Sequence, residues 1–340
     1  MPAQASDPSG YSPLRPSWPS IGVFSAVMGV AGLGLAWRGA AASMAPAAAP
    51  VGEVLLATAG LLWLGLVLAY AVRHVRRPGA TCAEFGDQVT ANLFATPSIG
   101  ALVLAAGLRP YAPSAALWLW AFGAAWQFSI ALVLIGRWHV LPTILSDVTP
   151  LKFLPIVGNI VAPLAGVPLG QAEISWFMFT VGLVIWFAIL PIVLHRLILS
   201  ETVLPDRLAP TLAILISPPA FGCLSHLALV GRFDEVCRLL FFTALFFGLF
   251  VLRLGKLVMR SPFSPVWWAL TFSSAALAGS AVQYHHAFPG VGSGALCWAL
   301  LTVASLVVAI VSARSLAPLS RRLLASGATA LGGRDLKAHR

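Results

Sequence analysis

The sequence predicts an all-α integral membrane protein with ten transmembrane helices. Only 9% of its 340 residues are charged and 59% are hydrophobic, whereas a soluble domain carries about 25% charged residues. A helical span needs about 20 apolar residues, and most of the uncharged stretches approach or exceed this length. They cover residues 16–37, 54–72, 88–108, 110–136, 153–172, 174–195, 208–231, 239–252 and 261–313.

Two of these stretches need separate treatment. Residues 261–313 are numerous enough for two spans, and the turn signal around Pro289-Gly290 divides them, which brings the count to ten. Residues 239–252 form the shortest stretch. The eighth helix reaches full length only if Arg238 or Arg253 extends its side chain toward the lipid headgroups.

The basic residues predict the orientation. An even number of spans places both termini on one side, and most of the 21 lysines and arginines fall on that side. The positive-inside rule then makes both termini cytoplasmic, in the inner (plasma) membrane of a bacterium. Contact of the basic loops with anionic lipid accounts for the net charge of +10 without nucleic acid. Four basic residues fall on the outer side: Arg38, Arg109, Arg232 and Arg238.

The chain is expected to form a single membrane domain over residues 17–315. Residues 1–16 are polar and lack the basic start of a signal peptide, so we expect a disordered cytoplasmic tail there. Residues 316–340 are predicted to form a basic cytoplasmic tail.

Proline and tryptophan alternate between successive spans. The odd spans are rich in small residues and contain Pro97, Pro163, Pro218 and Pro219, whereas the even spans contain most of the tryptophans. Large aromatic side chains suit lipid, while broken helices are tolerated where neighbouring helices or a cavity satisfy the freed backbone groups. The pattern predicts an inner ring of kinked helices within an outer ring of straight ones, and it argues against a purely structural scaffold.

Charged residues are absent from the centres of the predicted helices. Cation channels and proton pumps commonly place carboxylates there, whereas a path for anions should lack them. Backbone N–H groups at proline kinks, helix dipoles and hydroxyl groups would stabilise an anion. The alternative is that each hydroxyl bonds its own helix backbone. The candidate hydroxyls are Thr96, Ser98, Ser217, Ser225, Thr271 and Ser273.

No catalytic or metal-binding motif is recognisable. His285 and His286 are adjacent and so point to different faces of a helix, and the four cysteines form no C-x-x-C pair and are expected to be apolar filler. We expect neither enzymatic activity nor a cofactor or metal. The competing hypothesis is a membrane enzyme or cofactor binder that uses His226 together with His285 and His286.

Three motifs carry a resemblance to a known family. They are P-x-V-G-N-x-V-A-P-x-A-G at residues 155–166, S-W-F-x-F at 175–179 and P-T-L-x-I-L-x-x-P-P-A at 210–220. Together with the order and spacing of the helices, over about residues 17–315, they make the chain similar to the tellurite-resistance/dicarboxylate transporter family. That family includes bacterial tellurite-resistance permeases, fungal malate permeases and guard-cell slow anion channels.

The resemblance implies a specific architecture and a gate. Five helical hairpins would surround a central pore with quasi-fivefold symmetry, the odd helices would line it, and the protein would form a homotrimer with one pore per subunit. The family pattern W-[WA]-A-x-x-F-P matches residues 267–273, so Phe272 takes the position of the phenylalanine that closes the pore, and Ser273 replaces the family's proline. The candidates for the pore lining are Phe24, Phe94, Asn159, Phe221, Thr271 and Ser273.

The leading prediction is therefore an anion channel that passes small anions such as chloride or nitrate through a neutral pore gated by Phe272. The alternative is a C4-dicarboxylate or tellurite-oxyanion permease of the same family, with malate or tellurite as substrate. Proton coupling in such a permease normally needs a titratable group at depth, and His226 is the one candidate.

Overall fold

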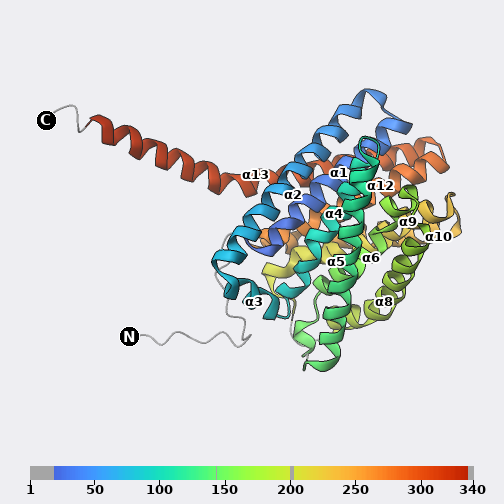
Figure 1. Ribbon diagram of the computed structural model, residues 1–340. Helices are drawn as coiled ribbons and strands as arrows, with labels where there is room; N and C mark the ends of the chain where they lie inside the picture. The colour runs from blue at the N-terminus through green and yellow to red at the C-terminus, as the bar shows by residue number, and fades with distance from the viewer. Residues whose placement is uncertain (1–18, 143, 200–202, 336–340) are drawn as a thin grey trace.

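The computed structural model describes residues 19–142, 144–199 and 203–335, with the backbone alone for 146 and 318–335. All regular structure in this part of the chain is helical (Figure 1). The α-helices are α1 (Ser25–Ser43), α2 (Ala49–Arg76), α3 (Pro78–Gly86), α4 (Thr96–Leu108), α5 (Pro113–Val140), α6 (Leu154–Val161), α7 (Pro163–Gly166), α8 (Ala172–Leu199), α9 (Ser217–Val230), α10 (Glu235–Arg253), α11 (Gly255–Arg260), α12 (Trp268–Ala287) and α13 (Val291–Asp335).

Buried and exposed spans alternate along the chain. In the spans that contain α1, α4, α6–α7 and α9, between 67% and 89% of the most apolar window is buried. In the spans that contain α2, α5, α8, α10 and α13 this share is between 17% and 39%. The small residues of the first group permit close helix packing, and the aromatic residues of the second group face outward. The inner and outer sets that the sequence predicted are confirmed for these spans.

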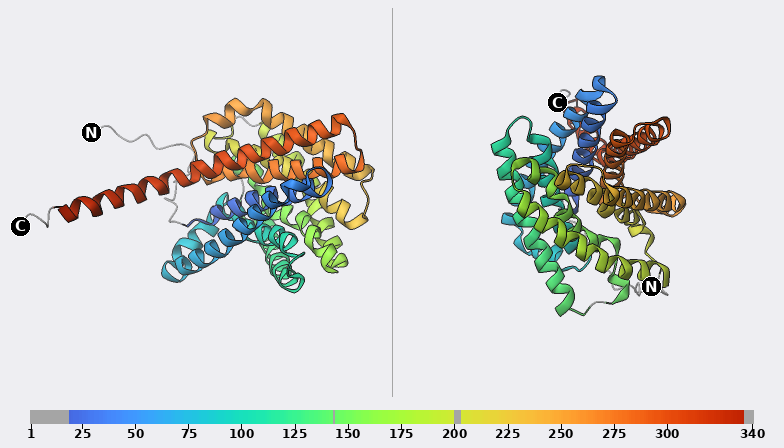
Figure 2. Two further views of the ribbon diagram at one scale, coloured as in Figure 1. Left: turned by 90° about the horizontal axis from the view of Figure 1, so that it is seen from above. Right: turned by 90° about the vertical axis from the view of Figure 1, so that its right-hand side faces the viewer.

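The buried helices contact one another in a closed order. Helix α1 contacts α4, α4 contacts α6 and α7, both of these contact α9, α9 contacts α12, and α12 contacts α1. The exposed helices pack on the outside of this ring, as α2 does on α1 and α4. Helix pairs spread outward from a common centre in the right-hand view of Figure 2. The exact quasi-fivefold symmetry stays a prediction.

Each buried span begins with a 3₁₀ segment. These segments are η1 (Ile21–Phe24), η3 (Thr90–Ala95), η5 (Pro150–Phe153), η7 (Asp206–Ile216) and η8 (Pro265–Trp267). They too contact one another in a closed order, from η1 through η3, η5 and η7 to η8 and back to η1. We call this end of the bundle the 3₁₀ end, and the opposite end, marked by Arg38 and Arg109, the arginine end.

The prolines mark the joints between these segments and the α-helices. Pro97 lies in the first turn of α4, and Pro218 and Pro219 lie in the first turn of α9. Proline is tolerated there because the first N–H groups of a helix have no partner within it. Pro163 begins α7 directly after α6 has ended. At Pro97 and at Pro218 and Pro219, the kinks that the sequence predicted are therefore changes from 3₁₀-helix to α-helix, and at Pro163 the kink is a break between two α-helices.

The number of spans is the point at which sequence and structure differ most. Within the described residues, nine helices are long and apolar enough to cross a membrane, and they include α10, the eighth span, with 19 residues. Helix α12 has 20 residues and is not among the nine. Its serines, Gln283 and two histidines lower its mean hydropathy. The count of ten therefore stays a prediction that depends on α12.

The two predicted tails differ in what the structure describes. Residues 1–16 lie outside the described residues. Helix α13 continues beyond 315 to Asp335 and projects away from the bundle (Figure 1), so the backbone is helical through most of the segment predicted as a basic tail.

Candidate functional site

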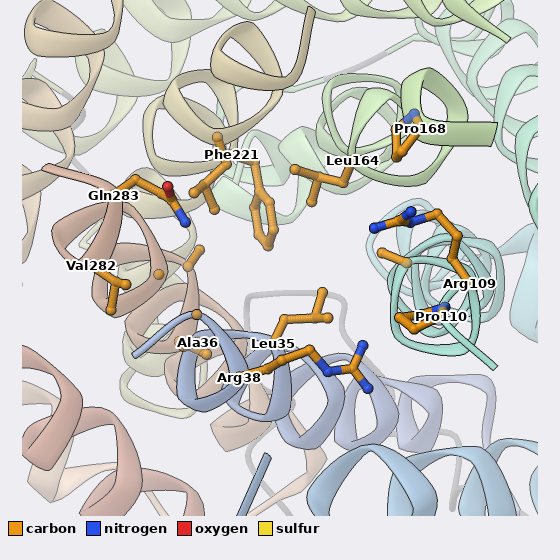
Figure 3. Close-up of a pocket in the computed structure, with 17 residues that line it drawn as sticks. Leu35, Ala36, Arg38, Arg109, Pro110, Leu164, Pro168, Phe221, Val282 and Gln283 are labelled. Atoms are coloured by element: carbon orange, nitrogen blue, oxygen red, sulfur yellow. The ribbon is translucent and has the colours of Figure 1, made fainter. Parts of the chain in front are cut away.

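A cavity of about 250 Å³ lies on the axis of the bundle at the arginine end (Figure 3). The four buried spans and helix α12 all contribute to its wall. Each contributes at least one residue: Leu35 from α1, Ala106 from α4, Leu164 from α7, Phe221 from α9 and Ala275 from α12. The described residues that line the cavity include two arginines, Arg38 and Arg109, and no carboxylate. The wall is therefore mainly apolar, with positive charge at its mouth.

Two aromatic rings are stacked at the inner end of this cavity. Phe221 and Phe272 stack with ring centroids 4.6 Å apart and an angle of 25° between the planes, and both are buried. Phe221 lines the cavity, and Phe272 lies one turn of α12 before the lining residues Ala275 and Ala276. Phe272 thus lies beside Phe221, on the side of the lining residues Ala275 and Ala276 that is nearer the 3₁₀ end.

Glycines on α1 make room for this part of α12. A Cβ atom at Gly32 would meet the Cβ of Ala275 at 3.3 Å and Cδ2 of Phe272 at 3.9 Å. A Cβ atom at Gly29 would overlap the side chain of Thr271. The two helices therefore pack closely only because α1 lacks side chains there, and this contact positions the aromatic ring.

The hydroxyl groups next to Phe272 are already bonded. Thr271 Oγ1 donates to the carbonyl of Trp268 in its own helix at 2.7 Å. Ser273 Oγ shares a hydrogen bond of 2.7 Å with Ser217 Oγ on the neighbouring α9. Neither Thr271 nor Ser273 lines the cavity. Ser273 joins two buried helices, which is a positioning role that a proline at this place could not fill through a side-chain hydroxyl.

Three other candidates for the pore lining also lie outside the cavity wall. Asn159 donates from Nδ2 to the carbonyl of Pro155 at 2.9 Å. Phe24 meets Tyr70 of α2 edge-on at 6.2 Å. Phe94 packs against Phe85 of α3 at 5.0 Å. Among the six candidates, Phe221 is the one that lines this cavity.

Sequence reasoning missed Gln127, which holds three helices together. Its side chain is completely buried on α5. Oε1 accepts a hydrogen bond of 2.7 Å from Ser98 of α4, and Nε2 donates to the carbonyl of Pro155 on α6 at 2.7 Å. A Cβ atom at Gly158 would overlap the Gln127 side chain, which explains why the motif at 155–166 has glycine there. Gln127 is the only amide or charged side chain in the stretch 110–136. A single amide in an otherwise apolar span was the feature of the sequence that could have indicated a buried hydrogen-bonding role.

The two arginines at the mouth of the cavity differ in their partners. Arg38 forms a two-bond ion pair with Glu53, at 2.7 and 2.6 Å, and also donates to the carbonyl of Gly107 at 2.8 Å. The neighbouring Glu53 carboxylate raises the pKa of Tyr111. Arg109 is exposed, its side chain points toward the cavity in Figure 3, and no ion pair of Arg109 is found within the described residues. Arg109 is therefore a positive charge at the mouth of the cavity that no carboxylate of the described residues neutralises.

The histidines considered as a joint site have different partners. His285 Nδ1 bonds Ser293 Oγ at 2.9 Å. His226 Nε2 bonds Asp234 Oδ2 at 2.9 Å, and Cys237 lies beside this pair. His226 thus belongs to a cluster in the α9–α10 turn, which the sequence did not predict.

The fold and the cavity together define a class: a multi-pass, all-α integral membrane protein with a cavity on the axis of its buried helices. The chain belongs to the SLAC1 family, because the family model described as "Voltage-dependent anion channel" matches residues 20–316. The resemblance predicted from the motifs is confirmed by this match.

Individual relatives are similar over long segments. The guard cell S-type anion channel SLAC1 of Arabidopsis thaliana is 24% identical over 315 residues, which are 88% of this chain and 56% of the relative. The S-type anion channel SLAH4 of the same plant is 25% identical over 66% of this chain and 65% of its own length. The tellurite resistance protein TehA homolog of Haemophilus influenzae is 25% identical over 78% of this chain and 81% of its own length. The chain thus spans less than two thirds of the two plant channels.

Proposed function

We propose that this protein transports anions and that it does so as a channel, with chloride and nitrate as the ions it passes. Membership of the SLAC1 family and similarity to S-type anion channels support the first part. The cavity supports the second, because its wall is mostly apolar and offers no carboxylate among its described residues. Anions held only by partial charges and an arginine at the mouth can leave as readily as they enter.

The observation that carries this proposal is the stacked pair Phe221–Phe272 at the inner end of the axial cavity. An apolar ring in a narrow passage excludes water and therefore ions. In the proposal Phe272 is the gate, and a passage opens when its ring leaves the axis. Small neighbours on α12, such as Ala275 and Ala276, leave space for that movement.

The orientation and assembly belong to the same proposal. The termini would be cytoplasmic, so that the arginine end and its cavity would face the outside of a bacterial inner membrane. The protein would assemble as a homotrimer with one path in each subunit.

The test is a planar-bilayer recording in asymmetric chloride that compares the native protein with Phe272→Ala. We expect the variant to conduct more, with a reversal potential that follows the chloride gradient. Phe246→Ala is the matched control, because Phe246 is 63% exposed on α10, away from the axis. Unchanged conductance in folded Phe272→Ala protein would contradict the gate.

A second candidate function is a permease for C4-dicarboxylates or tellurite oxyanions. It is favoured by the similarity to the TehA homolog, which extends over most of both chains. The pair His226–Asp234 would then be the titratable group that proton coupling needs. Saturable, pH-dependent uptake of malate or tellurite into proteoliposomes, without single-channel currents, would support this function and exclude the channel.

A further inference from the structure

The turn between α9 and α10 brings together three side chains with metal-binding atoms. A ring nitrogen of His226, a carboxylate oxygen of Asp234 and Sγ of Cys237 all lie within 4.8 Å of one another. Gly231, in the left-handed region at φ 77°, ends α9 and reverses the chain. The cluster lies at the arginine end of the bundle, five residues beyond Phe221 along α9.

The ligand types and the spacing fit a transition metal ion. An imidazole nitrogen, a carboxylate oxygen and a thiolate sulfur are the three ligand types of protein zinc sites. Bond lengths of about 2.0–2.3 Å place the ligand atoms of a tetrahedral site roughly 3.3–3.6 Å apart. Nε2 and Oδ2 are 2.9 Å apart, and the three ligand atoms lie within 4.8 Å of one another, so changes of about 1 Å in their separations would accommodate the ion.

The carboxylate is held in the orientation that a metal needs. Oδ1 of Asp234 accepts hydrogen bonds of 3.1 Å from the backbone N–H groups of Val236 and Cys237, which caps the start of α10. Oδ2 is thereby left for the ion. Outer hydrogen bonds of this kind fix ligand geometry in known metal sites.

Solvent can reach the cluster. Sγ of Cys237 donates to the backbone carbonyl of Cys223 at 3.7 Å, and both cysteines are buried. The side chains of His226 and Asp234 are 12% and 22% exposed, so an ion can enter from the surface. Water would complete a tetrahedron.

We propose that His226, Asp234 and Cys237 form a binding site for a divalent transition metal ion of the Zn²⁺ type. On binding, the ion replaces the hydrogen bond between His226 and Asp234, the Cys237 thiol releases its proton to solvent, and His226 coordinates through Nε2 as the neutral imidazole with its proton on Nδ1. The site joins the end of α9 to the start of α10. It does not depend on which anion the protein transports.

The test is a titration of the full chain with Co²⁺, which replaces Zn²⁺ and absorbs visible light. The protein is purified through a tag without histidine, stripped with a chelator and kept reduced, so that Cys223 and Cys237 cannot form a disulfide. We expect one Co²⁺ per chain, the strong visible bands of a tetrahedral site and a thiolate-to-cobalt charge-transfer band in the near ultraviolet.

Variants decide whether these residues are the ligands. Cys237→Ser should abolish the charge-transfer band, and His226→Ala should weaken binding roughly tenfold or more. His285→Ala and Cys297→Ser are the matched controls, since they remove a histidine at the same end and a buried cysteine elsewhere. Gel filtration and circular dichroism establish that each variant is folded. No cobalt spectrum with reduced protein, or a spectrum that Cys237→Ser leaves unchanged, would overturn the proposal.

Discussion

Replacement of Phe221 by leucine tests whether the stacked ring pair holds the passage shut. Phe221→Leu keeps an apolar side chain at the cavity but removes the ring that stacks on Phe272 at 4.6 Å. An aromatic pair contributes about 0.5–1.5 kcal/mol beyond its buried area. If the ring of Phe272 must leave this stack to open the passage, loss of the stacking energy in Phe221→Leu raises the ratio of open to closed protein by about 2- to 13-fold.

The assay is macroscopic anion conductance of reconstituted protein, normalised to the amount of folded protein in the membrane. The conductance of Phe221→Leu should rise within that range, provided that the closed state dominates in the native protein. Phe246→Leu, on the exposed face of α10, should leave it unchanged. In the Phe272→Ala background the same substitution should add little, because the stack is already gone. Unchanged or reduced conductance in Phe221→Leu, or equal effects in both backgrounds, would refute the idea that the stack keeps the gate closed.

Three further predictions concern Gln127, Arg109 and Asp234. Gln127→Leu should lower the free energy of unfolding by about 1–3 kcal/mol, because two buried hydrogen bonds between helices are lost; an unchanged thermal melting curve in detergent would argue against this role. Arg109→Glu should reduce anion conductance severalfold at low ionic strength and less at high salt, since the charge at the mouth is screened; Arg232→Glu, at an exposed arginine of the same end, is the control. For Asp234, burial raises the pKa. The hydrogen bonds from His226 and from the N–H groups of α10 lower it by a larger amount, so the pKa lies below the ordinary 3.8. Its stabilisation is therefore complete above that ordinary value and disappears as the pH falls through the lowered one; melting temperatures followed from about pH 5 to about pH 3 should fall less steeply in Asp234→Asn.

The features that were predictable from the sequence are those determined by the free energy of transferring side chains from water to lipid. Charge depletion and the length of the apolar stretches indicated a membrane protein, and the separation of small from aromatic residues indicated which spans are buried. Helix α12 was predicted as a span from the uncharged stretch 261–313, but its serines and histidines lower its mean hydropathy below that of the other spans. A local average of hydropathy does not identify a helix whose polar residues contact other helices.

The candidate site was only partly predictable. The motif placed Phe272 by analogy, and the structure added its stacking partner Phe221. The hydroxyls of Thr271 and Ser273 are used within and between helices, in keeping with the alternative that a hydroxyl first satisfies nearby backbone or neighbours. The role of Gln127 depends on two partners that are 28 and 29 residues away in the chain, which local spacing does not reveal.

By itself, the sequence determined that this chain enters a membrane, which of its spans avoid lipid and which family it belongs to. These properties follow from transfer free energies, which add up over the residues of a segment, and from motifs, which are short local patterns. The tertiary structure alone decided which side chains meet on the axis, which hydroxyls are already bonded and that His226, Asp234 and Cys237 come together. Those outcomes depend on the rotation of each helix about its own axis, which is set by packing against neighbours distant in the chain.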